Sequence, residues 1–250
     1  MARVLCIDIG NTSAHWGVLE DRAVLARGEV PTAEAARALA EGMAHDPAGI
    51  SVASVVPAAT QALRGALAAT GKEAFHLRHD TVVGLGFDYP RPEEVGQDRL
   101  ANCLGAQVTC GAPAIVVDMG TATTFDVLTG KGYAGGVIAP GLAVMTSYLH
   151  GRTALLPRLD PGSIRAGSAI GKSTQEAMRA GCALGFAGMI GTIVDALVAE
   201  MRAGDSAEPT LLATGGTADF LPAALSRRLR HVPHLTLMGL EEGWRRRGGC

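Results

Sequence analysis

The sequence has little of what marks several classes of protein. Its five cysteines are an odd number without a Cys-x-x-Cys pair, which is typical of a reduced intracellular protein with unreactive thiols. Its net charge is −2, and its one basic tract is "RRR" at 245–247, so binding driven by nucleic-acid phosphates is not expected. The opening "MARVLCIDIGNT" lacks the long apolar segment of a signal peptide. We therefore expect a cytoplasmic protein that binds neither nucleic acid nor membranes.

The most apolar long run, residues 182–201, lacks the uniform apolar character of a membrane span. A spanning helix needs about 20 mostly apolar residues without charge, whereas this run contains Asp195 and several glycines. Its apolar residues exceed one helical face, which predicts a helix that is buried nearly all round. Such a helix would pack either between domains or at a subunit interface.

A P-loop is also missing, although "AGSAIGKST" at 166–174 looks similar to one. The Walker A pattern is G-x-x-x-x-G-K-[ST] after an apolar strand. Here Ala166 occupies the first glycine position, and Gly167 leaves only three residues before Gly171. The preceding "LPRLDPGSIRA" is broken by prolines. If the chain binds phosphate, another element must hold it.

The 250 residues are 48% hydrophobic, enough for a substantial core in one large domain or two of about 100–150 residues each. An apolar strand followed by Asp-x-Gly and a hydroxyl residue occurs twice, in "VLCIDIGNT" (4–12) and "AIVVDMGTATT" (114–124). Two further apolar strands follow each copy. The sequence therefore predicts two halves of one design, residues 1–112 and 113–250.

Local patterns predict the elements of each half. Strands are expected at 3–10, 14–20, 23–30, 50–56, 73–78, at the apolar start of 114–124, and at 123–130, 133–139 and 210–216. Helices are expected at 32–44, 58–70, 93–110, 168–203 and 217–230. Thr32 is the expected N-cap of the first helix.

The repeated turn has a chemical interpretation. Successive backbone amides in such a turn form an anion-binding concavity, and the nearby aspartate can hold a Mg²⁺ ion that neutralises phosphate charge. Asp-x-Gly after a strand is also a common β-turn signal. Because two copies occur at matching positions, we predict that both turns bind the phosphates of a nucleotide in a cleft between the halves.

The motifs "DIGNT", "YPRPEEVGQDRLAN", "DMGTATTFDV", "GGVIAPGL", "IGKST" and "ATGG" occur in the order and spacing of type III pantothenate kinases. The chain resembles this family from about residue 3 to about residue 240. The resemblance implies an α/β fold of two ribonuclease H-like (actin-like ATPase) domains, each a mixed β-sheet flanked by helices, with the nucleotide cleft between them. It also implies ATP-dependent phosphorylation of pantothenate to 4'-phosphopantothenate, the first step of coenzyme A biosynthesis.

The resemblance also assigns roles to residues. Asp98 matches the proton acceptor and Asp118 the ligand of a monovalent cation, K⁺ or NH₄⁺. The positions that match ATP contacts are Asp8, Ile9, Gly10, Asn11, Thr12, Ser13, Ala14, His15 and Thr121. The positions that match pantothenate contacts are Tyr89, Gly96, Gln97, Asp98, Arg99 and Thr174. Gln97 departs from the family pattern, in which alanine is more common. The family is dimeric, so a homodimer is expected.

Several of these residues have plain structural alternatives. Asp98 could cap a helix, Tyr89 could be a half-buried loop residue, and the Thr174 hydroxyl could bond to its own helix. If Asp98 lies near a helix N-terminus, the helix dipole is expected to lower its pKa and keep it ionised. The alternative function is a non-catalytic nucleotide-binding accessory or regulatory protein of the same fold.

Overall fold

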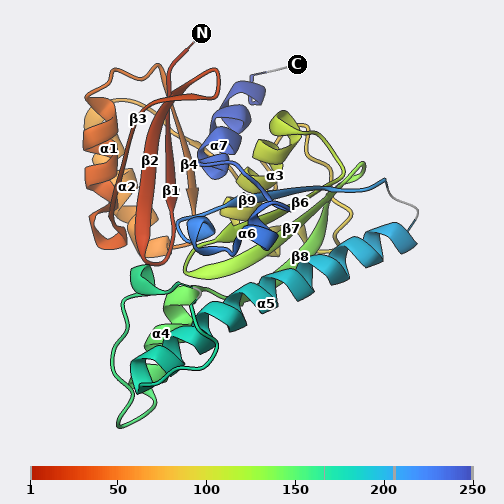
Figure 1. Ribbon diagram of the computed structural model, residues 1–250. Helices are drawn as coiled ribbons and strands as arrows, with labels where there is room; N and C mark the ends of the chain where they lie inside the picture. The colour runs from red at the N-terminus through yellow and green to blue at the C-terminus, as the bar shows by residue number, and fades with distance from the viewer. Residues whose placement is uncertain (1, 166, 205–206, 249–250) are drawn as a thin grey trace. The chain divides into compact units, whose positions relative to one another are not determined.

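The computed structural model describes residues 2–165, 167–204 and 207–248 (Figure 1). Ala166 and Cys250, on which part of the sequence reasoning rests, lie outside these residues. The chain forms two compact units. The first contains the chain up to Ala112, the short segment Gly130–Ala134, and the segment from His234 onward; the second contains 113–129 and 135–233. The division into halves at residue 112 stays a prediction.

The first unit contains a five-stranded mixed sheet. Its strands are β1 (Val4–Ile9), β2 (Ser13–Glu20), β3 (Ala23–Pro31), β4 (Gly49–Ser54) and β5 (Phe75–His76). Their order is β3-β2-β1-β4-β5. β1 pairs antiparallel with β2 and parallel with β4, so the ends of β1 and β4 lie at the same edge.

Helices cover both faces of this sheet (Figure 1). They are α1 (Ala35–Met43), α2 (Pro57–Thr70), α3 (Gln97–Thr109) and α7 (Leu235–Arg246). On one face, side chains of β1 such as Leu5 and Ile7 form a buried core with Leu39 of α1 and Leu63 of α2. On the other face, Ser51 of β4 donates a hydrogen bond to a carbonyl of α7 at 2.8 Å.

The second unit repeats this topology. Its sheet contains β6 (Ala114–Met119), β7 (Ala122–Thr129), β8 (Gly132–Pro140), β9 (Thr210–Thr214) and β10 (Arg230–His231), in the order β10-β9-β6-β7-β8. The first three residues of β8 belong to the first unit. β6 pairs antiparallel with β7 and parallel with β9, as β1 does with β2 and β4. The helices are α4 (Leu142–Gly151), α5 (Thr174–Ala203) and α6 (Ala223–Ser226). Both five-stranded sheets therefore follow one plan, as the repeated motif predicts.

Several predicted elements differ in detail. The strand expected at 73–78 is reduced to the two residues of β5, and the helix expected at 217–230 is replaced by a 3-10 turn and the four residues of α6. Helices α4 and α7 were missed. Thr32 is not an N-cap: the helix follows a 3-10 turn, and Glu34 precedes it without a side-chain cap. Within the basic "RRR" segment, Arg246 donates hydrogen bonds to Glu242 of α7 and to Gln107 of α3.

Helix α5 is the element whose burial differs most from the prediction. It is long and apolar enough to cross a membrane, yet only 28% of its most apolar stretch of 18 residues is buried. Most of its buried residues form one stripe at a spacing of four: Met178, Cys182, Phe186, Ile190, Val194 and Val198. Ala180 and Met201 are also buried. On the other side Leu184 is 52% exposed, and Asp195 forms an ion pair with Arg228. The prediction that this helix is buried nearly all round is therefore wrong for the single chain.

Candidate active site

The first turn, residues 8–15, joins β1 to β2. Gly10 N donates a hydrogen bond across it to Ser13 O at 3.0 Å. The Thr32 hydroxyl, expected to cap a helix, instead donates to Gly10 O at 2.7 Å. The turn is thus held from inside and from the start of the next helical segment.

The residues of the first turn divide into two groups. Asn11, Thr12 and His15 are exposed, and His15 Nε2 lies at hydrogen-bond distance, 3.1 Å, from Ser13 Oγ. Ile9 and Ala14 are fully buried, so they support the turn from within the sheet. A tip of polar groups on buried strand ends is what the anion-binding interpretation requires.

The second turn joins β6 to β7. Gly120 N donates to Ala122 O at 3.1 Å, and Thr121 O accepts a hydrogen bond from Gly141 N at 3.2 Å. A Cβ on Gly141 would lie 2.3 Å from Thr121 O, so only glycine allows this backbone approach. The Thr121 side chain itself is exposed.

The loop after β9 packs against the other side of the second turn. Thr217 Oγ1 donates to Met119 O at 3.0 Å. Gly215 has a φ of +91°, and a Cβ there would lie 2.7 Å from Asp118 Oδ1. Its backbone therefore meets the half-buried Asp118 carboxylate directly, where no side chain would fit.

The two turns are similar but not identical. In the first, Asp8 lies opposite His15 in the strand register; in the second, Asp118 lies opposite Thr124. The first turn is therefore one residue longer than the second. Matching the two motifs in the sequence does not reveal this difference.

Asp98 is the second residue of α3, and Gly96 precedes the helix. Arg99 N donates to Asp98 Oδ1 at 2.9 Å, so the carboxylate folds back over the helix N-terminus. A Cβ on Gly96 would lie only 2.5 Å from the same Oδ1. Glycine at position 96 thus makes room for the carboxylate.

The pKa of Asp98 is raised above its ordinary value, contrary to the expectation. Burial of the carboxyl group is the largest cause, and it outweighs the opposing hydrogen bond from Arg99 N and the charge of Arg99. Desolvation disfavours the charged form more than the helix N-terminus favours it. The raised pKa makes Asp98 a better proton acceptor than an exposed aspartate.

Arg99 and Tyr89 meet a third residue, Tyr133. The Arg99 guanidinium carbon lies 5.6 Å from the centre of the Tyr133 ring, within cation–π range. Tyr89 meets the same ring edge-on, with 5.5 Å between the ring centres. Tyr133 is 1% exposed. It brings together two predicted pantothenate contacts that are ten residues apart in the chain.

Sequence reasoning missed Tyr133, and the available signal was weak. Tyr133 lies in "GKGYAGG", between glycines that read as turn formers. The position of Tyr133 depends on a distant segment of the chain. Tyr133 N donates to Gly86 O at 2.9 Å, and Tyr133 O accepts from Asp88 N at 2.8 Å. This bridge fastens the segment before Tyr89 onto β8.

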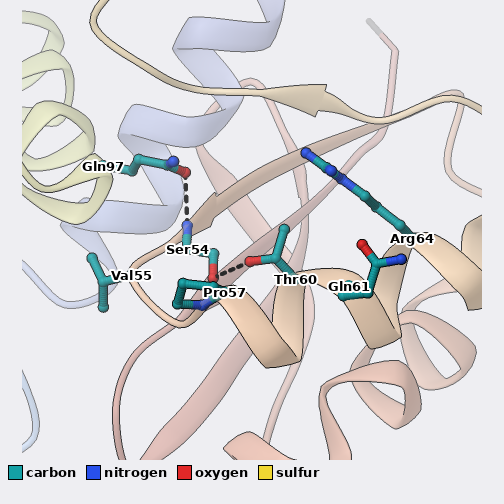
Figure 2. A pocket seen from close by; sticks show the side chains of 7 residues that line it. All are labelled: Ser54, Val55, Pro57, Thr60, Gln61, Arg64 and Gln97. Atoms are coloured by element: carbon teal, nitrogen blue, oxygen red, sulfur yellow. Dashed lines mark hydrogen bonds between the residues drawn. The ribbon is translucent and has the colours of Figure 1, made fainter. Parts of the chain in front are cut away.

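Gln97 lines a polar pocket of about 430 Å³ at the end of β4 (Figure 2). The other lining residues are Ser54, Val55, Pro57, Thr60, Gln61 and Arg64. Ser54 N donates to Gln97 Oε1 at 2.8 Å. The residue that departs from the family pattern therefore connects α3 to the end of β4.

The remaining predicted residue, Thr174, is the first residue of α5 and belongs to the second unit. Its side chain is exposed. Ser173 caps the helix by accepting a hydrogen bond from Glu176 N at 3.2 Å, and Lys172 N donates to the Glu176 carboxylate at 2.6 Å. "GKST" thus begins a capped helix rather than a P-loop. The first unit contains Gly96, Gln97, Asp98, Arg99 and Tyr89, together with the first turn.

Comparison with solved structures defines the class of fold. The (R)-2-hydroxyglutaryl-CoA dehydratase component A of Acidaminococcus fermentans superposes with a TM-score of 0.59 and 13% identity, over 97% of this chain and 96% of that one. The ROK hexokinase of Thermus thermophilus superposes with a TM-score of 0.52 and 15% identity, over 96% and 97% of the two chains. The protein has the fold of the actin-like ATPases and sugar kinases.

Sequence comparison then identifies the family. Residues 4–196 match the type III pantothenate kinase family model. A type III pantothenate kinase of Akkermansia muciniphila is 40% identical over 243 residues, which cover 94% of this chain and 96% of that protein. The chain belongs to the type III pantothenate kinase family.

Proposed function

We propose that this protein transfers the γ-phosphate of ATP to the terminal hydroxyl of pantothenate, forming 4'-phosphopantothenate for coenzyme A biosynthesis. The observation that carries the proposal is family membership over nearly the whole chain, with an aspartate at the position of the proton acceptor. We further propose that it works in the cytoplasm.

Asp98 is proposed to orient the hydroxyl and accept its proton. As the hydroxyl oxygen bonds to the γ-phosphorus, the bond from that phosphorus to the bridging oxygen breaks, and ADP leaves. The transition state of this transfer is loose, so placing the hydroxyl matters more than removing its proton early. A half-buried carboxylate with a raised pKa suits this late proton transfer.

The two turns are proposed to hold the phosphates of ATP. The first turn offers Asn11, Thr12 and His15 beside its backbone amides, and the second offers Thr121. Close backbone contacts at Gly141 and Gly215 give the second turn a defined shape. Asp8 is proposed to support the first turn.

Two kinds of cation are proposed to assist. Mg²⁺ bound to the ATP phosphates would neutralise charge that develops during the transfer. A monovalent cation, K⁺ or NH₄⁺, is assigned to Asp118. The carboxylate there, met by the backbone of Gly215 without an intervening side chain, supplies the oxygen ligands that hard cations prefer.

Arg99, Tyr89 and Thr174 are proposed to bind pantothenate, with Gly96, whereas the amide oxygen of Gln97 is already engaged by Ser54 N. A guanidinium suits the carboxylate of pantothenate because it can donate two parallel hydrogen bonds. The buried Tyr133 ring contacts both Arg99 and Tyr89. Rigid support of this kind is what keeps a binding group in a productive position.

We also propose that the protein is a homodimer that buries the exposed side of α5. Leu184 on α5 and Tyr148 on α4 are 52% and 64% exposed. Between these helices lies an apolar hollow of about 260 Å³, lined by Met145, Tyr148, Leu149, Gly181 and Cys182. Exposed apolar area of this kind marks interaction surfaces. A second copy of the chain carries the same apolar surface and could cover it.

The deciding experiment is an ADP-release assay with pantothenate, Mg²⁺-ATP and K⁺, with the product identified by mass spectrometry. ADP release is expected to depend on pantothenate. Asp98→Asn is expected to lower kcat by at least about 100-fold, whereas Asp80→Asn, at an exposed aspartate of the same unit, retains the wild-type rate.

Two outcomes would contradict these assignments. If the purified wild-type protein binds ATP but forms no phosphopantothenate at any ATP concentration, the non-catalytic accessory role is the better description. If Asp98→Asn is as active as wild type, the kinase remains but Asp98 is not its proton acceptor.

A further inference from the structure

The segment that ends β4 has three consecutive N–H groups with three different partners. Val55 N donates to Ile9 O at 3.1 Å, and Val56 N donates to Ser54 Oγ at 3.2 Å. Ser54 N donates to Gln97 Oε1 at 2.8 Å (Figure 2). Gln97 is therefore the side chain by which α3 completes the hydrogen bonding of this segment.

The segment also joins two parts of the proposed site. Ile9 lies beside Ser54 in the parallel pairing of β1 with β4, and it precedes Gly10 of the first turn. Gln97 is the first residue of α3 and precedes Asp98. A continuous path of hydrogen bonds thus runs from the first turn through the end of β4 to the helix that carries Asp98. All of its residues belong to the first unit.

We propose that Gln97 is a positioning residue for phosphoryl transfer: by holding Ser54, its amide oxygen fixes the start of α3, and with it the Asp98 carboxylate, relative to the first turn. This inference rests on the proposed kinase function for its kinetic consequences. A misplacement of about 1 Å can cost about 100-fold in rate. Gln97 also gives the N–H of the half-buried Ser54 a hydrogen-bond partner. Without that partner, burial of this N–H would cost free energy.

We call the hydrogen bond from Ser54 N to Gln97 Oε1 the tether. It is a feature of this chain and is not implied by the family resemblance. The family resemblance gives position 97 only a place in the pantothenate-contacting segment, with alanine more common there. Alanine offers no acceptor to Ser54 N. The competing explanation is that Gln97 contacts pantothenate directly, which predicts a change in KM rather than in kcat.

The first test compares two variants that remove an amide from the same pocket. Gln97→Met keeps the length of the side chain but removes the acceptor, and Gln61→Met changes an exposed glutamine of α2 that lines the pocket. Gln97→Met is expected to lower kcat about 10-fold while KM for pantothenate and ATP stays within about twofold. Gln61→Met is expected to match wild type. A rise in the pantothenate KM at unchanged kcat would overturn the proposal.

The second test asks whether Gln97 acts through Asp98. In an Asp98→Asn background, Gln97→Met is expected to cost less than about twofold in kcat, because residues that act as one unit are not additive. An equal loss in both backgrounds would mean that Gln97 acts independently of Asp98, contrary to the proposal.

The third test does not depend on activity. Hydrogen exchange of the Ser54 amide is expected to be about 10-fold faster in Gln97→Met than in wild type, since an opened hydrogen bond exposes the N–H to solvent. Unchanged exchange would remove the tether, whatever the kinetics. If instead wild type forms no phosphopantothenate while exchange responds as expected, the kinase proposal fails and the tether remains.

Discussion

At the scale of single residues, small geometric facts determine the proposed chemistry. Gly96 leaves room for the Asp98 carboxylate, and burial of that carboxylate raises its pKa. Tyr133 places Arg99 and Tyr89 on one ring. Each of these depends on neighbours that are visible only in the folded chain.

Gly96→Ala is expected to lower kcat by about 10-fold or more with little change in Tm. The new Cβ would come within 2.5 Å of Asp98 Oδ1, so the carboxylate must rotate away. The backbone at Gly96 has a φ of −55°, which alanine adopts without strain. Steady-state kinetics and thermal unfolding check this, and a wild-type kcat would show that the carboxylate position is not critical.

The pH dependence of kcat/KM is expected to show an acid limb above the ordinary aspartate pKa. Because burial raises the pKa of Asp98, the carboxyl group becomes protonated, and stops accepting a proton, at a higher pH than an exposed aspartate. Activity therefore falls as pH decreases through that raised pKa. The residual rate of Asp98→Asn should lack this limb. A limb at or below the ordinary aspartate value would contradict the assignment.

At the scale of elements, α3 is held by its packing against α7. A Cβ on Gly239 of α7 would lie 1.8 Å from Ala101 O, and one on Gly105 of α3 would lie 2.5 Å from Leu235 O. The two helices therefore meet backbone to backbone. Thr236 adds a hydrogen bond to Asn102 Oδ1 at 2.8 Å. The helix that carries Asp98 is thus positioned by a segment from the other end of the chain.

Gly239→Ala is expected to destabilise the protein by about 2 kcal/mol or more, because the backbone atoms that it meets cannot move aside. Gly65→Ala in α2 is the matched control, since a Cβ there has no atom within 4 Å. It should stabilise by roughly 0.5–1 kcal/mol, the usual gain from replacing glycine in a helix. Urea denaturation measures both, and equal effects at the two sites would refute the packing argument.

At the scale of the whole molecule, the two sheets share one strand order, and α5 leaves an apolar side uncovered. Glycines on that side of α5 permit a close approach of another helix. Leu184 belongs to a wider exposed apolar area with Tyr148 and the hollow between α4 and α5, and an area of this kind marks an interaction surface. The proposed homodimer accounts for this exposure.

Leu184→Glu is expected to shift the protein from dimer to monomer. The new charge would have to be buried without a partner in the interface, which is strongly unfavourable. Leu25→Glu on β3 is the control, because Leu25 is 51% exposed and Leu184 52%, and it should remain dimeric. Light scattering after size-exclusion chromatography gives the masses. A monomeric wild type would rule out the interface.

Much of the fold could be predicted from the sequence because the signals are local. Apolar runs that end in Asp-x-Gly specify a strand and a turn through neighbouring residues, so β1, β2 and β3 lie close to their predicted bounds and β6 lies within the predicted motif. The family motifs supplied the candidate site residues. The match to the family model confirms the family that they indicate, while the individual roles stay predictions.

By itself the sequence determined the two strand-and-turn units, their repetition and the family. Only the tertiary structure decided the direction of the Asp98 pKa shift, the meeting of Arg99 and Tyr89 at Tyr133, the tether at Gln97 and the exposed side of α5. The physical reason is that turns and strands depend on adjacent residues. Burial, and the contacts that tune a carboxylate, depend on which distant segments pack around it.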